Sequence, residues 1–274
     1  MLKYGIMLNA SLVLFNHSVT ETAPLVNALR QSACVKDVFL IDNSPVQNPD
    51  FRKLPATYIF NNKNLGYGAG HNIAIRKSME QNVPYHLVVN PDIQFESSIL
   101  DVLVAFKQKN PDVGLLMPKV LYPSGEIQYL CKLLPKPSDL FIRRFLPPKW
   151  TQQSNERFEL RQSGYDKIMD VPYLSGCFML LRTGALKSVG LFDERFFMYP
   201  EDIDLTRRIH REYRTVFYPN VSVTHHHTQG SYKTGRLLWI HLTNMIRYFN
   251  KWGWFFDTER KKVNEKILEQ LKML

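Results

Sequence analysis

The sequence predicts an α/β protein in which helices flank a mostly parallel β-sheet, with a helical extension at the C-terminal end. Over the first 120 residues, short apolar runs typical of strands alternate with segments whose apolar residues recur at helical spacing. Each apolar run ends in polar, turn-forming residues. Strand, helix and strand in this order are typical of a parallel sheet with right-handed crossovers.

The elements of this sheet follow one another along the chain. Strands are expected at four apolar runs: Leu12–Phe15, Val38–Ile41, Tyr58–Phe60 and Leu87–Val89. Helices are expected over Thr22–Ser32 and Asn72–Glu80, and Tyr173–Leu181 is a further buried run. Residues 132–170 show no sustained period, so they are expected to form a long excursion over the active face or an inert surface insertion.

Composition limits the possible classes of protein. The chain has 274 residues, 45% hydrophobic and 22% charged, which is typical of a folded globular protein. Cys34, Cys131 and Cys177 form no C-x-x-C pair, so we expect a reducing, cytoplasmic environment without disulfides or a zinc site. The stretch Tyr4–Thr20 is interrupted by polar residues and is not expected to be a signal peptide, and no segment is apolar enough to span a bilayer.

The formal net charge of +10 is concentrated near the C-terminus. Residues 232–274 contain nine Lys or Arg and four Asp or Glu, which gives +5, half of the total. Interleaved Trp, Phe and Leu make this a basic, aromatic-rich segment of the kind found in interfacial helices. An anionic membrane surface, nucleic acid or a phosphorylated substrate could each match the charge, and a helix packed on the domain with a basic outer face is an alternative.

Each predicted strand ends in a polar side chain. These residues are Asn16, Asp42, Asn64 and Asp92. Ligands of open parallel sheets bind outside the carboxyl ends of the strands, so we expect the four side chains to converge on one crevice. Asn and Asp also favour turns, but Pro91 already supplies the turn before Asp92.

A second acidic site is predicted at Pro200-Glu201-Asp202-Ile203-Asp204. Proline and carboxylates suit the first turn of a helix, and a carboxylate there could also act as a general base. Apolar residues of this helix would pack inward and leave Arg207, Arg208 and Arg211 outside, with Asp204 paired to Arg207 or Arg208.

Two further motifs have residues suited to a nucleotide and a metal. The segment Asn64–Asn72 carries three alternate glycines before a helix, which allows close approach of the backbone to a phosphate, although it matches neither G-x-G-x-x-G nor a P-loop. The strand-like segment Val223–His227 ends in three histidines. One imidazole with Asp92 and phosphate oxygens would suit Mg²⁺ or Mn²⁺.

Taken in order, these motifs resemble the inverting family 2 glycosyltransferases of the GT-A fold, and most closely their bacterial rhamnosyltransferase branch. The resemblance runs from about residue 8 to 231 and rests on Phe15-Asn16, Leu40–Ser44, Asn64–Asn72, Asn90-Pro91-Asp92, Ser175-Gly176 and Gly190–Leu205. It implies a domain over residues 1–231, with a nucleotide-binding half (1–120) and an acceptor and catalytic half (121–231), followed by the basic extension (232–274).

The resemblance also implies roles for individual residues. Asp202 matches the catalytic base, and Asp92 matches the carboxylate that holds a divalent cation on the donor diphosphate, with Asn90 in place of the usual first carboxylate. Spacing to Gly230-Ser231 favours His226 as the further metal ligand, while His225 and His227 stay open. Donor-binding residues are expected at Asn16, Asp42, Asn43, Asn64, Gly66, Gly70, Asn72, Asn90 and Asp92.

The implied reaction is metal-dependent transfer, with inversion, of a sugar from a nucleotide-sugar to a hydroxyl of a saccharide acceptor that could be linked to a lipid diphosphate. The implied donor is dTDP-rhamnose, with a UDP-sugar as the alternative, and a lipid-linked acceptor would bring the chain to the inner face of the plasma membrane. A nucleotidyltransferase would need a glycine-rich, basic loop after the first strand, and Leu12–Thr20 has none. No nucleic-acid-binding motif accompanies the basic residues, so nucleic acid is not expected as a partner.

Overall fold

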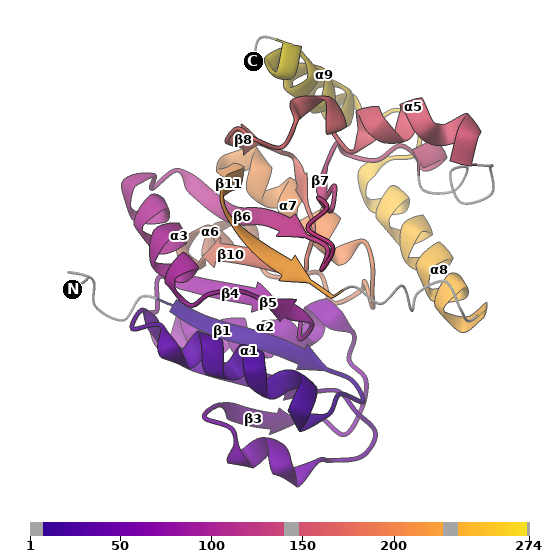
Figure 1. The fold of residues 1–274 in the computed structure, drawn as a ribbon. Helices are drawn as coiled ribbons and strands as arrows, with labels where there is room; N and C mark the ends of the chain where they lie inside the picture. The colour runs from indigo at the N-terminus through magenta and orange to yellow at the C-terminus, as the bar shows by residue number, and fades with distance from the viewer. Residues whose placement is uncertain (1–7, 140–147, 227–234, 273–274) are drawn as a thin grey trace.

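The computed structural model describes residues 8–139, 148–226 and 235–272. Within these ranges the chain builds a nine-stranded sheet in the order β3-β2-β1-β4-β10-β6-β11-β5, with β8 paired to β11 (Figure 1). Its strands are β1 (Leu8–Leu14), β2 (Val35–Asp42), β3 (Thr57–Phe60), β4 (Tyr85–Val89), β5 (Ile93–Gln94), β6 (Val113–Leu121), β8 (Met169–Asp170), β10 (Phe178–Arg182) and β11 (Arg214–His225). A small separate sheet pairs β7 (Cys131–Lys132) with β9 (Tyr173–Leu174).

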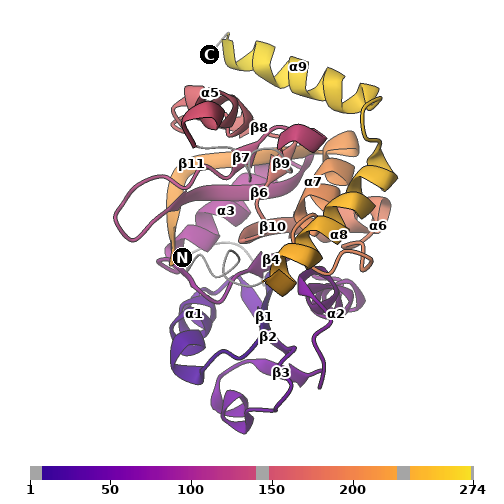
Figure 2. The same ribbon diagram turned by 90° about the vertical axis from the view of Figure 1, so that its right-hand side faces the viewer.

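The large sheet is mostly parallel. Strand β1 runs parallel to both β2 and β4, and β6 runs parallel to β11. Only β10 interrupts the central run, because it lies antiparallel between β4 and β6. The parallel strands β1, β4 and β6 therefore present their carboxyl ends at one edge, and Figure 2 looks onto that edge.

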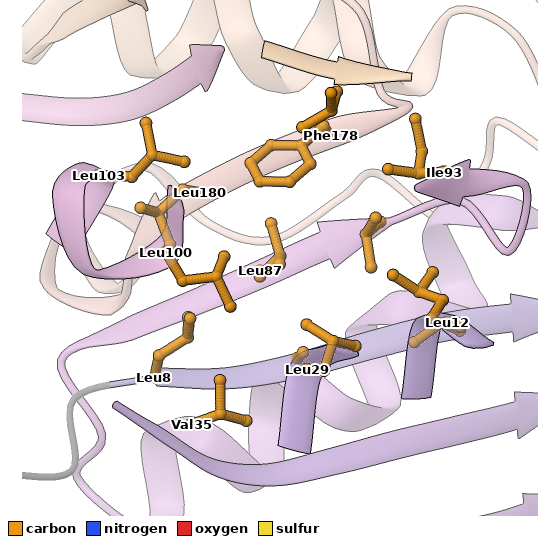
Figure 3. Close-up of a cluster of buried hydrophobic side chains, with 14 of the residues drawn as sticks. Leu8, Leu12, Leu29, Val35, Leu87, Ile93, Leu100, Leu103, Phe178 and Leu180 are labelled. Carbon is orange, nitrogen blue, oxygen red and sulfur yellow. The ribbon is translucent and has the colours of Figure 1, made fainter. Parts of the chain in front are cut away.

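Helices cover both faces of the sheet. They are α1 (Val19–Gln31), α2 (Tyr67–Glu80), α3 (Ser98–Lys109), α5 (Pro148–Phe158), α6 (Thr183–Val189), α7 (Glu201–Glu212), α8 (Gly235–Trp252) and α9 (Thr258–Lys272), with 3₁₀ turns η1 (Pro49–Lys53) and η2 (Arg161–Ser163). On one face, α1 and α3 bury Leu29, Leu100 and Leu103 against sheet residues such as Leu8 and Leu87 (Figure 3). On the other face, α2, α6 and α7 pack against a second apolar cluster.

This architecture confirms the predicted α/β class, the mostly parallel sheet and the helical C-terminal extension. The expected strands and helices of the first 120 residues are present, although most begin a few residues earlier than predicted. The run predicted over Tyr173–Leu181 is split into β9 and β10 at Ser175-Gly176. Residues 132–170 were expected to lack regular structure, and this was wrong in part, because α5 and η2 lie there and Tyr165 is buried in the second cluster.

No helix in the described ranges combines the length and the apolar character needed to cross a bilayer. The helices α8 and α9 instead pack on the rest of the domain. Phe249 and Tyr248 of α8 form a buried cluster with Ile203 of α7, and Asn264 of α9 exchanges two hydrogen bonds of 2.9 Å with the backbone of Leu134. The inner faces of the extension are therefore part of the packed protein.

Candidate active site

The carboxyl ends of β1, β2 and β3 form one side of the sheet edge at which the parallel strands end. Asn16 has a left-handed backbone (φ 58°), and its N–H donates to Ser44 Oγ at 2.8 Å. The buried Asp42 carboxylate accepts hydrogen bonds from Tyr58 Oη at 2.6 Å and from the Ser44 N–H at 2.9 Å. Burial, and then this carboxylate, raise the pKa of Tyr58. Asp42 is therefore held rigidly at the strand end where a nucleobase was expected.

The glycines of the Asn64–Asn72 segment serve close packing. Gly66 has φ +89°, and a Cβ added to it would lie 2.3 Å from the carbonyl oxygen of Phe197. A Cβ on Gly70 would lie 2.7 Å from Val13 Cγ2. The side chain of Asn43 donates to the Gly66 carbonyl at 3.0 Å, which ties β2 to the start of α2. These contacts explain the need for glycine without a ligand, and a contact of Gly66 or Gly70 with the donor stays a prediction.

Two asparagines of the same segment also have structural partners. The exposed Asn64 accepts a hydrogen bond from the Gly66 N–H at 3.0 Å and so shapes the turn into α2. Asn72 is buried; it donates to the Phe192 carbonyl at 2.9 Å and to Glu194 Oε1 at 2.9 Å, and accepts from the Phe192 N–H at 3.1 Å. Because these bonds satisfy the Asn72 amide, the side chain of Asn72 ties α2 to residues 192–194.

At the end of β4, Asp92 lies next to a histidine whose orientation is fixed by a glutamine. Nε2 of His225 lies 3.2 Å from Asp92 Oδ1. Gln128 Nε2 donates to the His225 carbonyl at 2.9 Å, which leaves Gln128 Oε1 to accept from His225 Nδ1 at 2.9 Å. In neutral His225 the proton is thus on Nδ1, and the Nε2 lone pair faces the carboxylate. Two electron-pair donors at this distance are suited to share a cation.

The histidine beside Asp92 is therefore His225, whereas His226 was favoured by spacing. His226 is exposed, and its backbone N–H donates to the Asp92 carbonyl at 2.9 Å. His227, also left open, lies outside the described residues. The described part of the chain contains no group of three or more His, Cys, Asp or Glu side chains suited to a metal. Asp92 and His225 fit a divalent cation only if other oxygens, such as those of a diphosphate, complete its coordination.

A tyrosine connects this pair to the second acidic site. Tyr67 Oη lies 3.0 Å from Asn90 Oδ1 and 2.8 Å from the Gly176 carbonyl oxygen. Burial raises the pKa of Tyr67 well above its ordinary value, and Cys177 and the nearby carboxylates of Glu201, Asp202 and Asp92 add to this. Asn90, which replaces a carboxylate in the resemblance, is therefore an acceptor for a tyrosine hydroxyl that lies between the two acidic sites.

Asp202, in the first turn of α7, is a buried carboxylate held by backbone donors. Its Oδ2 accepts from the Gly176 N–H at 2.9 Å, and its Oδ1 accepts from the Ile203 N–H at 2.8 Å. Burial raises the pKa of Asp202 to about 6, although the hydrogen bonds oppose this rise. Burial and then Asp202 raise the pKa of Glu201 well above its ordinary value. Asp202 thus presents an oriented carboxylate with a pKa just below neutrality, as a general base requires.

Sequence reasoning missed Gln128, Lys132 and Tyr173. Lys132 Nζ lies 5.5 Å from the centre of the Tyr173 ring, and its charge lowers the pKa of Asp202, against the larger effect of burial. The pairing of β7 with β9 brings Lys132 and Tyr173 together from distant parts of the chain. The composition of residues 121–139 gave no signal for this contact, because the pairing depends on tertiary structure.

The expectation that Arg207 lies on the outside of α7 was wrong. Its side chain is 2% exposed and forms two hydrogen bonds of 2.7 Å with the carboxylate of Asp257, which is 3% exposed. Oε2 of Glu259, at the start of α9, lies 2.6 Å from Nη2 of Arg207. The predicted ion pair of Asp204 with Arg208 is present, with Arg208 Nε 2.9 Å from Asp204 Oδ2. The C-terminal extension covers the face of α7 that was predicted to be exposed.

Comparison with solved structures identifies the fold. The chain superposes on a mannosyltransferase from Pyrobaculum calidifontis in complex with GDP-Man and Mn²⁺ with a TM-score of 0.56, at 14% identity over 89% of this chain and 65% of that one. It also matches TarS of S. aureus (residues 1–349) with a TM-score of 0.53, at 16% identity over 80% and 60% of the two chains. The fold is that of the GT-A glycosyltransferases.

Sequence comparison gives more particular relatives. The chain is 31% identical over 203 residues, 69% of its length, to the N-acetylglucosaminyl-diphospho-decaprenol L-rhamnosyltransferase of Mycobacterium tuberculosis (strain CDC 1551 / Oshkosh). It is 28% identical over 193 residues, 67% of its length, to rhamnosyltransferase WbbL of Escherichia coli (strain K12), covering 69% of that protein. These similarities confirm the resemblance to rhamnosyltransferases. The chain spans 62% of the mycobacterial relative, and no protein-family model matches it.

Proposed function

We propose that this chain is an inverting glycosyltransferase that moves L-rhamnose from dTDP-rhamnose to a hydroxyl of a polyprenyl-diphosphate-linked saccharide. The observation that carries the proposal is the buried Asp202 carboxylate, oriented by the Gly176 N–H and separated from the Asp92–His225 pair by Tyr67 and Asn90. The two related rhamnosyltransferases support the sugar, and the decaprenyl-diphosphate-linked acceptor in the name of the mycobacterial relative supports the acceptor class.

In the proposed reaction, Asp202 accepts the proton of the acceptor hydroxyl as its oxygen attacks the anomeric carbon of the donor. The bond from that carbon to the diphosphate oxygen breaks on the opposite face, and the nucleoside diphosphate leaves with the electron pair. The configuration at the anomeric carbon is therefore inverted, and no covalent enzyme intermediate is needed.

Other side chains would prepare the reaction. The N–H donors of Gly176 and Ile203 hold the base in one orientation, and a pKa of about 6 keeps it ionised yet basic at neutral pH. Asp92 and His225, which replaces His226 in this proposal, would hold Mg²⁺ or Mn²⁺. Such an ion would stabilise the charge that develops on the leaving diphosphate. Asp42, Asn43 and Asn16 are the proposed contacts of the nucleoside.

A thermal-shift panel tests the donor. dTDP, UDP, GDP and CDP are each added with and without Mn²⁺, and a ligand at 100 times its Kd should stabilise the fold by about 2.7 kcal/mol. We expect the largest shift with dTDP and Mn²⁺ together. A preference for UDP would replace the proposed donor, and no response to any nucleotide would contradict the proposed activity.

Replacing the proposed base tests the chemistry separately. Asp202→Asn should lower kcat by about 10²–10⁴-fold, because general-base catalysis is lost, while the affinity for dTDP and Mn²⁺ changes little. Glu201→Gln is the matched control, since it makes the same change of carboxylate to amide at the buried residue next to Asp202 in the chain and leaves the proposed base in place. Turnover of Asp202→Asn within a few-fold of the parent would remove Asp202 as the base.

Peripheral membrane association at the cytoplasmic leaflet follows from the proposed acceptor. Each basic residue of the 232–274 extension that approaches an anionic surface would contribute about 1 kcal/mol of attraction. A flotation assay with anionic and neutral vesicles tests this part of the proposal. Recovery of the intact protein away from both kinds of vesicle would argue against it.

A further inference from the structure

A large groove lies on the molecule apart from Asp92 and Asp202. It has a volume of about 1120 Å³ and lies between α5, the segment 133–139 and the start of α9, at the top of the view in Figure 1. It is lined from three directions by apolar and basic side chains. Its apolar lining includes Leu133, Phe158, Trp254, Phe255, Phe256 and Leu268.

The apolar part of this groove has a buried floor and an exposed rim. Leu133 and Phe158 are buried, whereas Phe255 and Phe256, in the turn between α8 and α9, are 78% and 97% exposed. Covering such phenyl rings removes apolar surface from water and so stabilises a complex. Two adjacent phenylalanines held in solvent beside an open groove favour an apolar ligand.

Three cations surround the groove without a carboxylate partner among the described residues. They are Lys136, Arg157 and Lys261, all exposed. Acidic side chains also line it, but Asp257 is bound by Arg207, and Asp139 accepts the Lys136 backbone N–H at 2.8 Å. Glu265 is the third. With the Asp257–Arg207 pair set aside, the three exposed cations outnumber Asp139 and Glu265, and this excess of positive charge favours an anionic group.

The segment that lines one side of the groove leads along the chain from the neighbourhood of the proposed base. Leu133 follows Lys132, whose ammonium group lies 5.5 Å from the Tyr173 ring and acts electrostatically on Asp202. From Lys132 the chain needs four residues to reach Lys136, which is at most about 14 Å of extended backbone. An acceptor hydroxyl at Asp202 and a charged group at Lys136 could thus belong to one molecule.

We propose that this groove binds the lipid diphosphate of the acceptor, with Lys136, Arg157 and Lys261 around the diphosphate and Phe158, Phe255 and Phe256 against the first isoprene units. The proposal rests on the function proposed above and assigns a location to the lipid part of that substrate. An apolar floor, an aromatic rim and three exposed cations in one groove match both the isoprenoid and the diphosphate parts of such a lipid.

Binding of farnesyl diphosphate to the full chain tests the groove without any transfer reaction. We expect calorimetry to detect binding, with farnesol and inorganic diphosphate each binding at least tenfold more weakly. Lys136→Glu combined with Lys261→Glu should weaken farnesyl diphosphate at least tenfold. Lys262→Glu is the matched control, because Lys262 is exposed on the same helix but does not line the groove, and it should bind normally.

Several results would overturn the proposal. Equal losses of farnesyl diphosphate affinity in the Lys136→Glu, Lys261→Glu double variant (the groove variant) and in Lys262→Glu would indicate binding through general surface charge, as for anionic lipid headgroups. Inorganic diphosphate binding as tightly as farnesyl diphosphate would indicate an anion site without a lipid. A dimer that dissociates in Phe256→Ser, measured by light scattering, would show that a second copy covers the groove.

Transfer assays separate this proposal from the proposed function. In the groove variant, the ratio of kcat/KM for a lipid-linked acceptor to that for the same saccharide without lipid should fall at least tenfold. An unchanged ratio would overturn the groove assignment while leaving the glycosyltransferase intact. Absence of transfer by the parent protein to any acceptor would instead contradict the proposed function, and the farnesyl diphosphate titration would still test the groove.

Discussion

Replacing Gln128 by leucine tests whether the proposed metal site depends on a residue that would not touch the metal. Gln128 holds the His225 ring through two hydrogen bonds of 2.9 Å, one to Nδ1 and one from its own amide to the His225 carbonyl. Gln128→Leu introduces an apolar side chain of similar size and removes both bonds, so the Nε2 lone pair of His225 is no longer fixed toward Asp92. Loss of such an outer partner typically weakens metal binding 10–100-fold, or about 1.4–2.7 kcal/mol.

The assay is a titration of Mn²⁺ in the presence of dTDP, with free Mn²⁺ measured by electron paramagnetic resonance. Gln94→Leu is the control, because Gln94 is exposed in β5 and pairs with Thr224, the residue before His225. We expect the Kd for Mn²⁺ to rise 10–100-fold in Gln128→Leu and to stay unchanged in Gln94→Leu. An unchanged Kd in Gln128→Leu would refute the argument that Gln128 orients a metal ligand.

Three further predictions concern the base, the C-terminal extension and the glycine segment. Because burial raises the pKa of Asp202 to about 6, kcat/KM should be constant above that pH and fall about tenfold per unit below it, which a pH–rate profile would show. Asp257→Asn should lower the free energy of unfolding in urea by about 3 kcal/mol, since Arg207 loses a buried partner but keeps Glu259, and a loss below 1 kcal/mol would contradict this. Gly66→Ala should lower the melting temperature more than Gly184→Ala, because a Cβ on Gly66 meets the Phe197 carbonyl at 2.3 Å and a Cβ on Gly184 meets nothing within 4 Å.

The sheet could be predicted because its strands carry their own signal. Strand β4 is buried along its whole length, and its sequence is accordingly an apolar run that ends at Asn90-Pro91-Asp92. The helix α5 could not be predicted in the same way. Its sequence, PKWTQQSNERF, has only two large apolar residues, Trp150 and Phe158, too few for a helical stripe.

The candidate site was predicted as far as local sequence allowed. Asp92 and Asp202 follow from a strand end and a helix start, which are local features. The choice between His225 and His226 depends instead on the pairing of β11 with β5, which sets His225 opposite Ile93 and hence beside Asp92. Successive residues of a strand point to opposite faces, so an error of one residue in this register exchanges the two imidazoles.

The surroundings of Asp204 show why the C-terminal extension matters for the proposed base. Asp204 is fully buried two residues after Asp202, and its carboxylate contacts Arg208 at 2.9 Å, Lys251 Nζ at 2.6 Å and Trp252 Nε1 at 2.8 Å. Two of these three partners belong to α8. A buried carboxylate that loses its partners typically costs 3–5 kcal/mol, so α7 should keep its position only while α8 is docked. The inner face of the extension thus holds the helix that carries the proposed base, and Phe255 and Phe256 stay exposed in its outer turn, where we propose that the acceptor lipid binds.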